Sequence, residues 1–343
     1  MEEVRRANTT LLTAEQGFRV GGLEILRLGQ RLRYPDVVYA PLVHRRDGGG
    51  GTESVDDDCD RRGLNSPGRV SCDVDEHPPQ STTIQNVTDS RPIGFFDSGI
   101  GGVAVLAEVR RLLPAEQLIY FADRANFPYG PKTDQQIVGL ARAASERLLE
   151  RSVKAIVVAC NTASTVALSD LRARYDIPFV GMVPAVKPAS TLSRSGKVGV
   201  LATEATSQGE TLADLITQFA NGATVTTVAA AELASLVEQG AEESEIEPRL
   251  RHYLDPLLAD GVDTVVLGCT HYFFLRPLVE RLTSLTTLDA AEPVARRVAQ
   301  VLTESGLLAP PTREGGVEYM TSGDSRELAR VLDHWRKAGS SIP

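Results

Sequence analysis

The spacing of apolar and polar residues along this chain changes near residue 91. From Arg91 onward, short apolar runs alternate with longer segments whose apolar residues recur at helical spacing. The runs predicted to form strands are IGFFDSG (93–99), LIYFAD (118–123), KAIVVAC (154–160), FVGM (179–182), KVGVLAT (197–203), TVTTVAA (224–230) and TVVLGC (264–269). Helices are predicted over residues 103–113 and 133–151, and between the later runs. This alternation predicts an α/β fold whose parallel sheets carry helices on both faces.

Residues 1–90 have a different composition. The stretches RRDGGGGTESVDDDCDRRG (45–63) and DVDEHPPQSTTIQNVTDS (73–90) are rich in Gly, Asp, Ser and Pro and poor in apolar residues. Such segments bury too little apolar surface to offset the entropy lost on ordering. We therefore predict a low-complexity, disordered N-terminal extension over 1–90 that the chemistry does not need, although residues 17–43 could form a short hairpin or two.

Composition and charge limit the classes of function. The chain has 343 residues, of which 42% are hydrophobic, and a formal net charge of −9. This length accommodates about two domains of ~100–200 residues. An acidic chain without a basic stripe is a poor candidate for binding nucleic acid. No apolar run approaches the ~18 residues that a membrane span needs, and the N-terminus lacks the apolar core of a secretory signal. A cytoplasmic protein is expected.

Four cysteines occur, Cys59, Cys72, Cys160 and Cys269. They form neither a C-x-x-C pair nor an array with zinc-finger spacing, and four are too few for a disulfide scaffold in a chain of this length. The sequence therefore predicts a reducing compartment and no metal site.

Two of these cysteines occupy the same kind of position. Cys160 and Cys269 each end an apolar run and are followed by polar residues that favour the start of a helix. A thiol at a helix N-terminus is biased toward its thiolate form. A single cysteine of this kind is most often a small buried hydrophobic residue. Here two cysteines lie at equivalent strand-to-helix junctions, which we call the thiol corners, and both have polar neighbours. This indicates two related halves that each present a sulfur to a shared cleft.

Two further loops, each following a predicted strand, contain candidate functional residues. FFDSGIGG (95–102) places Asp97 and Ser98 at a strand end, and its glycines allow the backbone to approach a ligand closely. This loop lacks both the G-x-G-x-x-G spacing and the lysine of a nucleotide-binding loop. NFPYGPKT (126–133) presents Tyr129 and Gly130, although an ordinary tight turn would have a similar sequence.

The motifs FFDSGIGG, FPYGPKT, VVACNTAST, VGMVPAVKPA and VVLGCTHY, in this order, resemble those of the bacterial glutamate racemases, within the cofactor-independent aspartate/glutamate racemase superfamily. The similarity covers about residues 92–310. It implies two pseudo-symmetric α/β domains with the active site at their interface. We expect the first domain over 92–188 plus 294–343 and the second over 189–293.

The resemblance also implies roles for individual residues. Cys160 would remove the α-proton of the D enantiomer and Cys269 that of the L enantiomer, with Asp97 and His271 assisting the proton transfers. The residues expected to bind the substrate are Asp97, Ser98, Tyr129, Gly130, Asn161, Thr162, Thr270 and His271. Glu238 matches an acidic position of the family, although a glutamate on a helix is usually exposed.

Further expectations follow from the same resemblance. The reaction would need no cofactor and would supply D-glutamate for peptidoglycan and hence for cell-wall biogenesis and cell shape. A homodimer is expected, together with activation by a UDP-linked muropeptide precursor, and an inhibitory contact with DNA gyrase could coexist. Two departures from the family's motifs, FADRANFPYG (121–130) and Phe273, predict altered loop packing rather than lost chemistry.

Two alternatives remain open at this point. The first is a racemase for aspartate or another amino acid, although relatives specific for aspartate carry glutamate where His271 stands. The second is a binding or regulatory protein that keeps the fold without turnover, which would not require both thiols. A pyridoxal-phosphate racemase is disfavoured because neither thiol corner carries a lysine.

Overall fold

The computed structural model describes residues 18–20, 23–25, 88–340 and 342–343. The chain divides into two units, Met1–Val37 and Val38–Pro343. In the first, β1 (Phe18–Val20) pairs antiparallel with β2 (Leu23–Ile25), which agrees with the hairpin allowed by the sequence. The rest of the predicted extension up to residue 87, with Cys59 and Cys72, lies outside the described residues. Among the helices described, none is long and apolar enough to cross a membrane.

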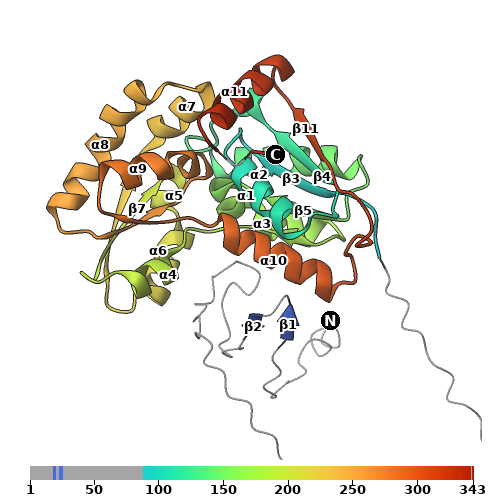
Figure 1. Ribbon diagram of the computed structural model, residues 1–343, viewed down its shortest axis with the longest axis horizontal. Coiled ribbons are helices and arrows are strands. Elements are labelled where there is room, and N and C mark those ends of the chain that lie inside the picture. The colour runs from blue at the N-terminus through green and yellow to red at the C-terminus, as the bar shows by residue number, and fades with distance from the viewer. Residues whose placement is uncertain (1–17, 21–22, 26–87, 341) are drawn as a thin grey trace, which may run out of the picture. The chain divides into compact units, whose positions relative to one another are not determined.

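The second unit contains two sheets in which every strand pairing is parallel (Figure 1). The five-stranded sheet has the order β11-β4-β3-β5-β6, and the four-stranded sheet has the order β10-β9-β7-β8. The strands of the first sheet are β3 (Ile93–Asp97), β4 (Leu118–Ala122), β5 (Ala155–Val158), β6 (Phe179–Val180) and β11 (Val317–Thr321). Those of the second are β7 (Lys197–Ala202), β8 (Thr224–Ala229), β9 (Thr264–Leu267) and β10 (Thr286–Leu288). We call the parts built on these sheets the first half and the second half.

Helices connect the strands and flank both sheets (Figure 1). They are α1 (Val103–Leu112), the 3-10 helix η2 (Arg124–Asn126), α2 (Asp134–Leu149), α3 (Asn161–Arg174), α4 (Val186–Leu192), α5 (Glu204–Gln208), α6 (Glu210–Phe219), α7 (Ala231–Gln239), α8 (Glu243–Ala259), the 3-10 helix η3 (Thr270–Leu275), α9 (Arg276–Leu282), α10 (Ala291–Glu304) and α11 (Ser325–Lys337). The prediction of an α/β fold with parallel sheets is confirmed. The predicted domain boundaries at residues 188 and 294 stay a prediction.

The two sheets share one strand order, which gives the molecule its internal symmetry. The run β4-β3-β5-β6 in the first half matches β8-β7-β9-β10 in the second. In this correspondence β3 matches β7 and β5 matches β9. The chain order reverses direction between β3 and β5, and likewise between β7 and β9, and ligands of such sheets bind outside the carboxyl ends of the strands at this switch point.

Local sequence explains where several elements begin and end. The central strands are runs of apolar residues with almost no exposed surface, such as Val157 and Val158 in β5, and each buried side chain of this size contributes about 1.5–3 kcal/mol. Thr133 and Gln136 form a reciprocal capping box at the start of α2. Helix α7 ends at Gly240, whose positive φ of 68° suits glycine.

Asp89, which lies within the predicted extension, packs against the first half. The backbone N–H of Asp89 donates to the carbonyl of Leu308 (2.9 Å). The carbonyl of Asp89 accepts from Lys154 Nζ (2.7 Å), and this buried ammonium also pairs with Glu116 at 2.6 Å. Residue 89 therefore belongs to the packed structure, because it supplies one of the partners of a fully buried cation.

Candidate active site

The two candidate thiols occupy equivalent positions in the two halves. Cys160 lies two residues beyond β5, and Cys269 lies two residues beyond the matching strand β9. Both are free and buried, with 4% and 5% of their surface exposed. Cys160 is the N-cap of α3, and its sulfur accepts from the Ala163 backbone N–H at 3.5 Å. The sequence instead pointed to Asn161 and its neighbours as cap residues, but these lie within the first turn of the helix.

The second thiol corner differs from the first in its local structure. The predicted helix start after Cys269 is the 3-10 helix η3, and α9 begins only at Arg276. This tighter turn places His271 Nδ1 at 3.9 Å from the Cys269 sulfur. The imidazole is therefore close enough to exchange a proton with the thiol after a small adjustment.

Asp97 connects the two halves at the carboxyl end of β3. Its Oδ1 accepts from the Ser98 N–H (2.6 Å) and its Oδ2 from the Gly102 N–H (2.7 Å). The same Oδ2 accepts from the hydroxyl of Thr270 in the second half (3.0 Å). The Ser98 hydroxyl lies 3.9 Å from the sulfur of Cys160, and Thr270 directly follows Cys269. One short chain of contacts therefore joins the two thiol corners.

The matching contact on the other side of the symmetry involves Thr203. This residue directly follows β7, the counterpart of β3, and its hydroxyl lies 3.0 Å from that of Thr162 in the first half. The hydroxyl of Thr206 lies 3.0 Å from that of Thr203. Sequence reasoning placed Thr203 at the end of a strand without assigning it to the site, and the signal that could have identified it is its position opposite Asp97 in the repeated strand order.

The glycine loop after β3 packs against the second half of the protein. A Cβ on Gly99 would lie 2.1 Å from Glu238 Oε2, and one on Gly101 would lie 2.4 Å from the Thr270 hydroxyl. The N–H of Ile100 between them donates to Glu238 Oε2 at 2.8 Å. The sequence predicted that these glycines admit a ligand, whereas here they admit side chains of the opposite half.

His271 is held by a buried carboxylate. Its Nε2 lies 2.7 Å from Glu238 Oε2, and the other carboxylate oxygen accepts from Arg124 Nε. Glu238 is only 4% exposed, so the usual expectation of an exposed helical glutamate is wrong at this position. Burial alone would lower the pKa of His271, but the neighbouring Cys269 sulfur and the Glu238 carboxylate together raise it well above its ordinary value. The imidazole is thus favoured in its protonated form.

The electrostatic environment of Cys160 disfavours its charged form, whereas that of His271 favours the charged form. Burial raises the pKa of Cys160 well above its ordinary value, and the nearby Asp97 carboxylate adds to this effect more than the Ala163 N–H opposes it. The expectation that a helix N-terminus makes this thiol a thiolate is therefore wrong for the structure as it stands. Burial also raises the pKa of Asp97, so this carboxyl group accepts a proton more readily than an exposed aspartate does.

The remaining predicted binding residues fall into two groups. Asn161 is 3% exposed, and neither of its side-chain amide atoms has a hydrogen-bond partner among the described residues. A buried amide normally has partners, so this one is available to a ligand. The hydroxyl of Tyr129 instead donates to Asp123 Oδ2 at 2.6 Å, while Gly130 lies against Thr203, with 3.3 Å between a Cβ placed on it and the Thr203 Cβ.

Metal-ligand clusters and surface hollows are the other kinds of site to consider in the described part of the chain. Within the described part of the chain, no group of three or more His, Cys, Asp or Glu side chains is arranged to hold a metal ion. A surface hollow of about 580 Å³ lies between α7 and α8. It is lined by Leu236, Ser244, Glu245, Pro248, Arg249 and His252 and contains none of the residues described above.

Known proteins share this sequence and fold. The family described as Asp/Glu/Hydantoin racemase matches residues 93–298. A glutamate racemase of Roseiflexus sp. (strain RS-1) is 50% identical over 248 residues, which cover 71% of this chain and 91% of that protein. One from Deinococcus radiodurans is 46% identical over 254 residues, covering 73% and 88%.

Two solved structures show the same similarity in three dimensions. The Escherichia coli glutamate racemase in complex with L-glutamate and the activator UDP-MurNAc-Ala superimposes with a TM-score of 0.63 at 36% identity, covering 71% of this chain and 95% of that one. The glutamate racemase isoform RacE1 of Bacillus anthracis gives a TM-score of 0.64 at 28% identity, covering 72% and 94%.

Proposed function

Because the chain belongs to the Asp/Glu/Hydantoin racemase family, we propose that it interconverts L- and D-glutamate with two thiols as the acid and base. The observation that carries this proposal is the pairing of Cys160 and Cys269 at equivalent strand ends, joined through the Asp97–Thr270 contact. Racemisation requires that a proton leave one face of the α-carbon and that another arrive on the opposite face. One thiol on each side achieves this without turning the substrate over.

The pKa shifts of Cys160 and His271 indicate which thiol acts as the acid and which as the base in the first proton transfer. The raised pKa of Cys160 favours its neutral thiol, whereas the raised pKa of His271 favours an imidazolium beside the Cys269 sulfur. Beside the His271 imidazolium, Cys269 acts as the base that takes the α-proton of L-glutamate, and Cys160 donates its proton to the opposite face. The cycle closes when the Cys160 thiolate regains a proton through Asp97 or from solvent and the Cys269 thiol releases one proton to solvent. The reverse sequence converts D-glutamate.

The carbanionic transition state needs donors aimed at the substrate carboxylate. The amide of Asn161 is buried and unpartnered among the described residues, and Ser98, Thr162 and Thr270 place hydroxyls around the same corner. We assign these four residues to binding the α-carboxylate, together with the backbone near Gly130. Tyr129 acts indirectly, by holding its loop against Asp123.

The cellular setting is part of the same proposal. The D-glutamate formed would enter peptidoglycan and so serve cell-wall biogenesis and cell shape, with the enzyme acting in the cytoplasm as a homodimer. The name of the Escherichia coli structure includes an activator, UDP-MurNAc-Ala, and we extend activation by such a UDP-linked precursor to this chain. A contact with DNA gyrase is a secondary prospect that a pull-down with purified gyrase would test.

The experiment that tests the proposal follows the α-proton. The purified protein is incubated in D₂O with L- or D-glutamate, and in parallel with aspartate, while NMR records loss of the α-proton and circular dichroism records loss of chirality. We expect exchange and racemisation of glutamate by the wild type, and loss of racemisation in both Cys160→Ala and Cys269→Ala. Faster turnover of aspartate would reassign the substrate. No exchange with either acid, even with the UDP-linked precursor, would indicate a binding protein instead.

A further inference from the structure

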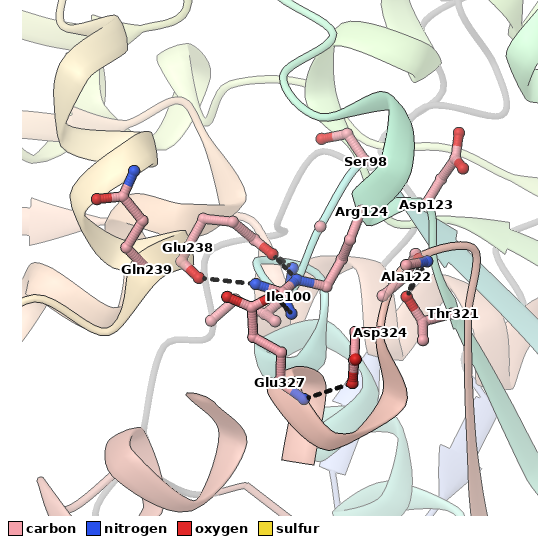
Figure 2. Close-up of polar contacts among 12 residues, drawn as sticks. Ser98, Ile100, Ala122, Asp123, Arg124, Glu238, Gln239, Thr321, Asp324 and Glu327 are labelled. Atoms are coloured by element: carbon pink, nitrogen blue, oxygen red, sulfur yellow. Dashed lines mark hydrogen bonds and ion pairs between the residues drawn. The ribbon is translucent and has the colours of Figure 1, made fainter. Parts of the chain in front are cut away.

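Arg124 reaches from the first half into the second. It lies in η2, directly beyond β4 and Asp123, and its side chain is 10% exposed. Its Nε donates to Glu238 Oε1, and its Nη2 donates to the Glu238 backbone carbonyl at 3.2 Å (Figure 2). The guanidinium thus holds one residue of α7 at two points, its carboxylate and its backbone.

The Glu238 carboxylate is fully engaged by three elements. Oε1 faces Arg124, while Oε2 accepts from the Ile100 N–H and from His271 Nε2. A carboxylate with fixed partners on both oxygens cannot rotate without breaking one of these bonds. The orientation of His271 relative to the Cys269 sulfur therefore depends, at one remove, on Arg124. From this geometry we propose that Arg124 is a positioning residue for the Cys269 half-reaction, acting through Glu238 and His271; the inference rests on the proposed function.

Helix α7 has donors at its C-terminal end other than Arg124. Its last turn exposes carbonyls that require donors. The carbonyl of Val237 accepts from Trp335 Nε1 (2.9 Å) and that of Gln239 from Arg330 Nη2 (3.2 Å), both on α11. Arg330 and Arg124 therefore support neighbouring carbonyls of the same helix end, but only Arg124 also contacts the carboxylate.

Charged and titratable groups from several elements face this cluster, and among them Asp97 and Cys269 face His271. His271 and Arg124 face the Glu238 carboxylate directly. Beyond Arg124, the exposed carboxylate of Glu327 at the start of α11 lies 3.8 Å from Nη1 (Figure 2). Burial would raise the pKa of Glu238, but its bonds to His271, to the Ile100 N–H and to Arg124 lower it. Removing the guanidinium therefore raises the pKa of Glu238, so that the carboxylate becomes protonated at a higher pH than in the wild type.

The pH dependence of activity follows from the direction of this change in the pKa of Glu238. A protonated Glu238 no longer stabilises the His271 imidazolium, so the active form exists only above the pKa of Glu238. In R124M the acid limb of the kcat/KM profile should move to higher pH, and kcat/KM at neutral pH should fall about 10- to 100-fold, less than the loss of a general acid itself. R124K, which keeps the charge, should restore most of the wild-type profile.

Three comparisons make the test decisive, with racemisation of glutamate followed by circular dichroism. R330M is the matched control, because it removes a donor from the adjacent carbonyl and should leave the profile unchanged. E238Q and the double variant R124M/E238Q should have the same kcat/KM, since Arg124 acts through Glu238. If R124M does not fold, R124Q is assayed instead, and the same changes in kcat/KM and in its pH profile are expected.

The outcomes that overturn the inference are separate from those that overturn the proposed function. A wild-type profile in R124M, an R330M variant that behaves like R124M, or independent effects in the double variant would each refute the role of Arg124. In all three cases the wild type still racemises glutamate. A wild-type protein that fails to do so would refute the proposed function instead.

Discussion

Substituting Gly101 by alanine tests whether the two halves must approach closely for catalysis. A Cβ at this position would lie 2.4 Å from the Thr270 hydroxyl oxygen and 2.7 Å from the His271 backbone nitrogen, whereas ordinary contact begins at 3.4 Å. The hydroxyl can rotate away, but the backbone nitrogen cannot. Because the interior is close-packed, the glycine loop and η3 must separate by roughly 0.7 Å.

This displacement is large on the scale of the site. It lengthens the Asp97–Thr270 hydrogen bond from 3.0 Å to beyond the ~3.2 Å at which such bonds weaken. A misplacement approaching 1 Å at reacting groups costs up to about 100-fold in rate. We therefore expect kcat/KM to fall roughly 10- to 100-fold, and the free energy of unfolding to fall by about 1–3 kcal/mol from overpacking.

Gly139→Ala is the matched control. Gly139 lies within α2, and no described atom lies within 4 Å of a Cβ placed there. Alanine favours a helix interior over glycine, so this variant should gain about 0.5–1 kcal/mol in unfolding free energy without a change in kinetics. Kinetics by circular dichroism and urea denaturation test both variants. A Gly101→Ala enzyme with wild-type kcat/KM would refute the argument from close approach.

Three further predictions concern binding and stability. Asn161→Ala should raise KM for glutamate while leaving the melting temperature equal or higher, because a buried amide unpartnered among the described residues costs about 1–3 kcal/mol. Lys154→Met should lower the free energy of unfolding in urea by about 3–5 kcal/mol by leaving the buried Glu116 unpaired, and adding Glu116→Leu should restore much of it. The raised pKa of His271 stabilises the folded state fully below pH 6.5, and this contribution is lost as pH rises through the higher folded-state pKa. The difference in unfolding free energy between wild type and His271→Asn should therefore shrink toward alkaline pH, and a constant difference would contradict it.

Much of the fold could be predicted because its signals are local. The apolar runs that lead to Asp97, Cys160 and Cys269 are short enough to bury as parallel strands; Asp97 is the last residue of its strand, and each cysteine lies two residues beyond its own. β10 and β11 were not predicted, because Thr286–Leu288 is short, and Val317–Thr321 is half-exposed and neither continuously apolar nor regularly alternating.

The sequence by itself determined which side chains lie near the carboxyl ends of the strands. The spacing of apolar residues that distinguishes a strand from a helix is a property of neighbouring residues, so it can be recognised without the rest of the chain. It therefore placed Cys160 and Cys269 at equivalent corners. Only the tertiary structure decided which groups meet across the two halves, as in the pairing of Arg124 with Glu238, separated by 114 residues. It also decided that the pKa of Cys160 is raised, because desolvation depends mainly on the groups that other segments pack around the thiol.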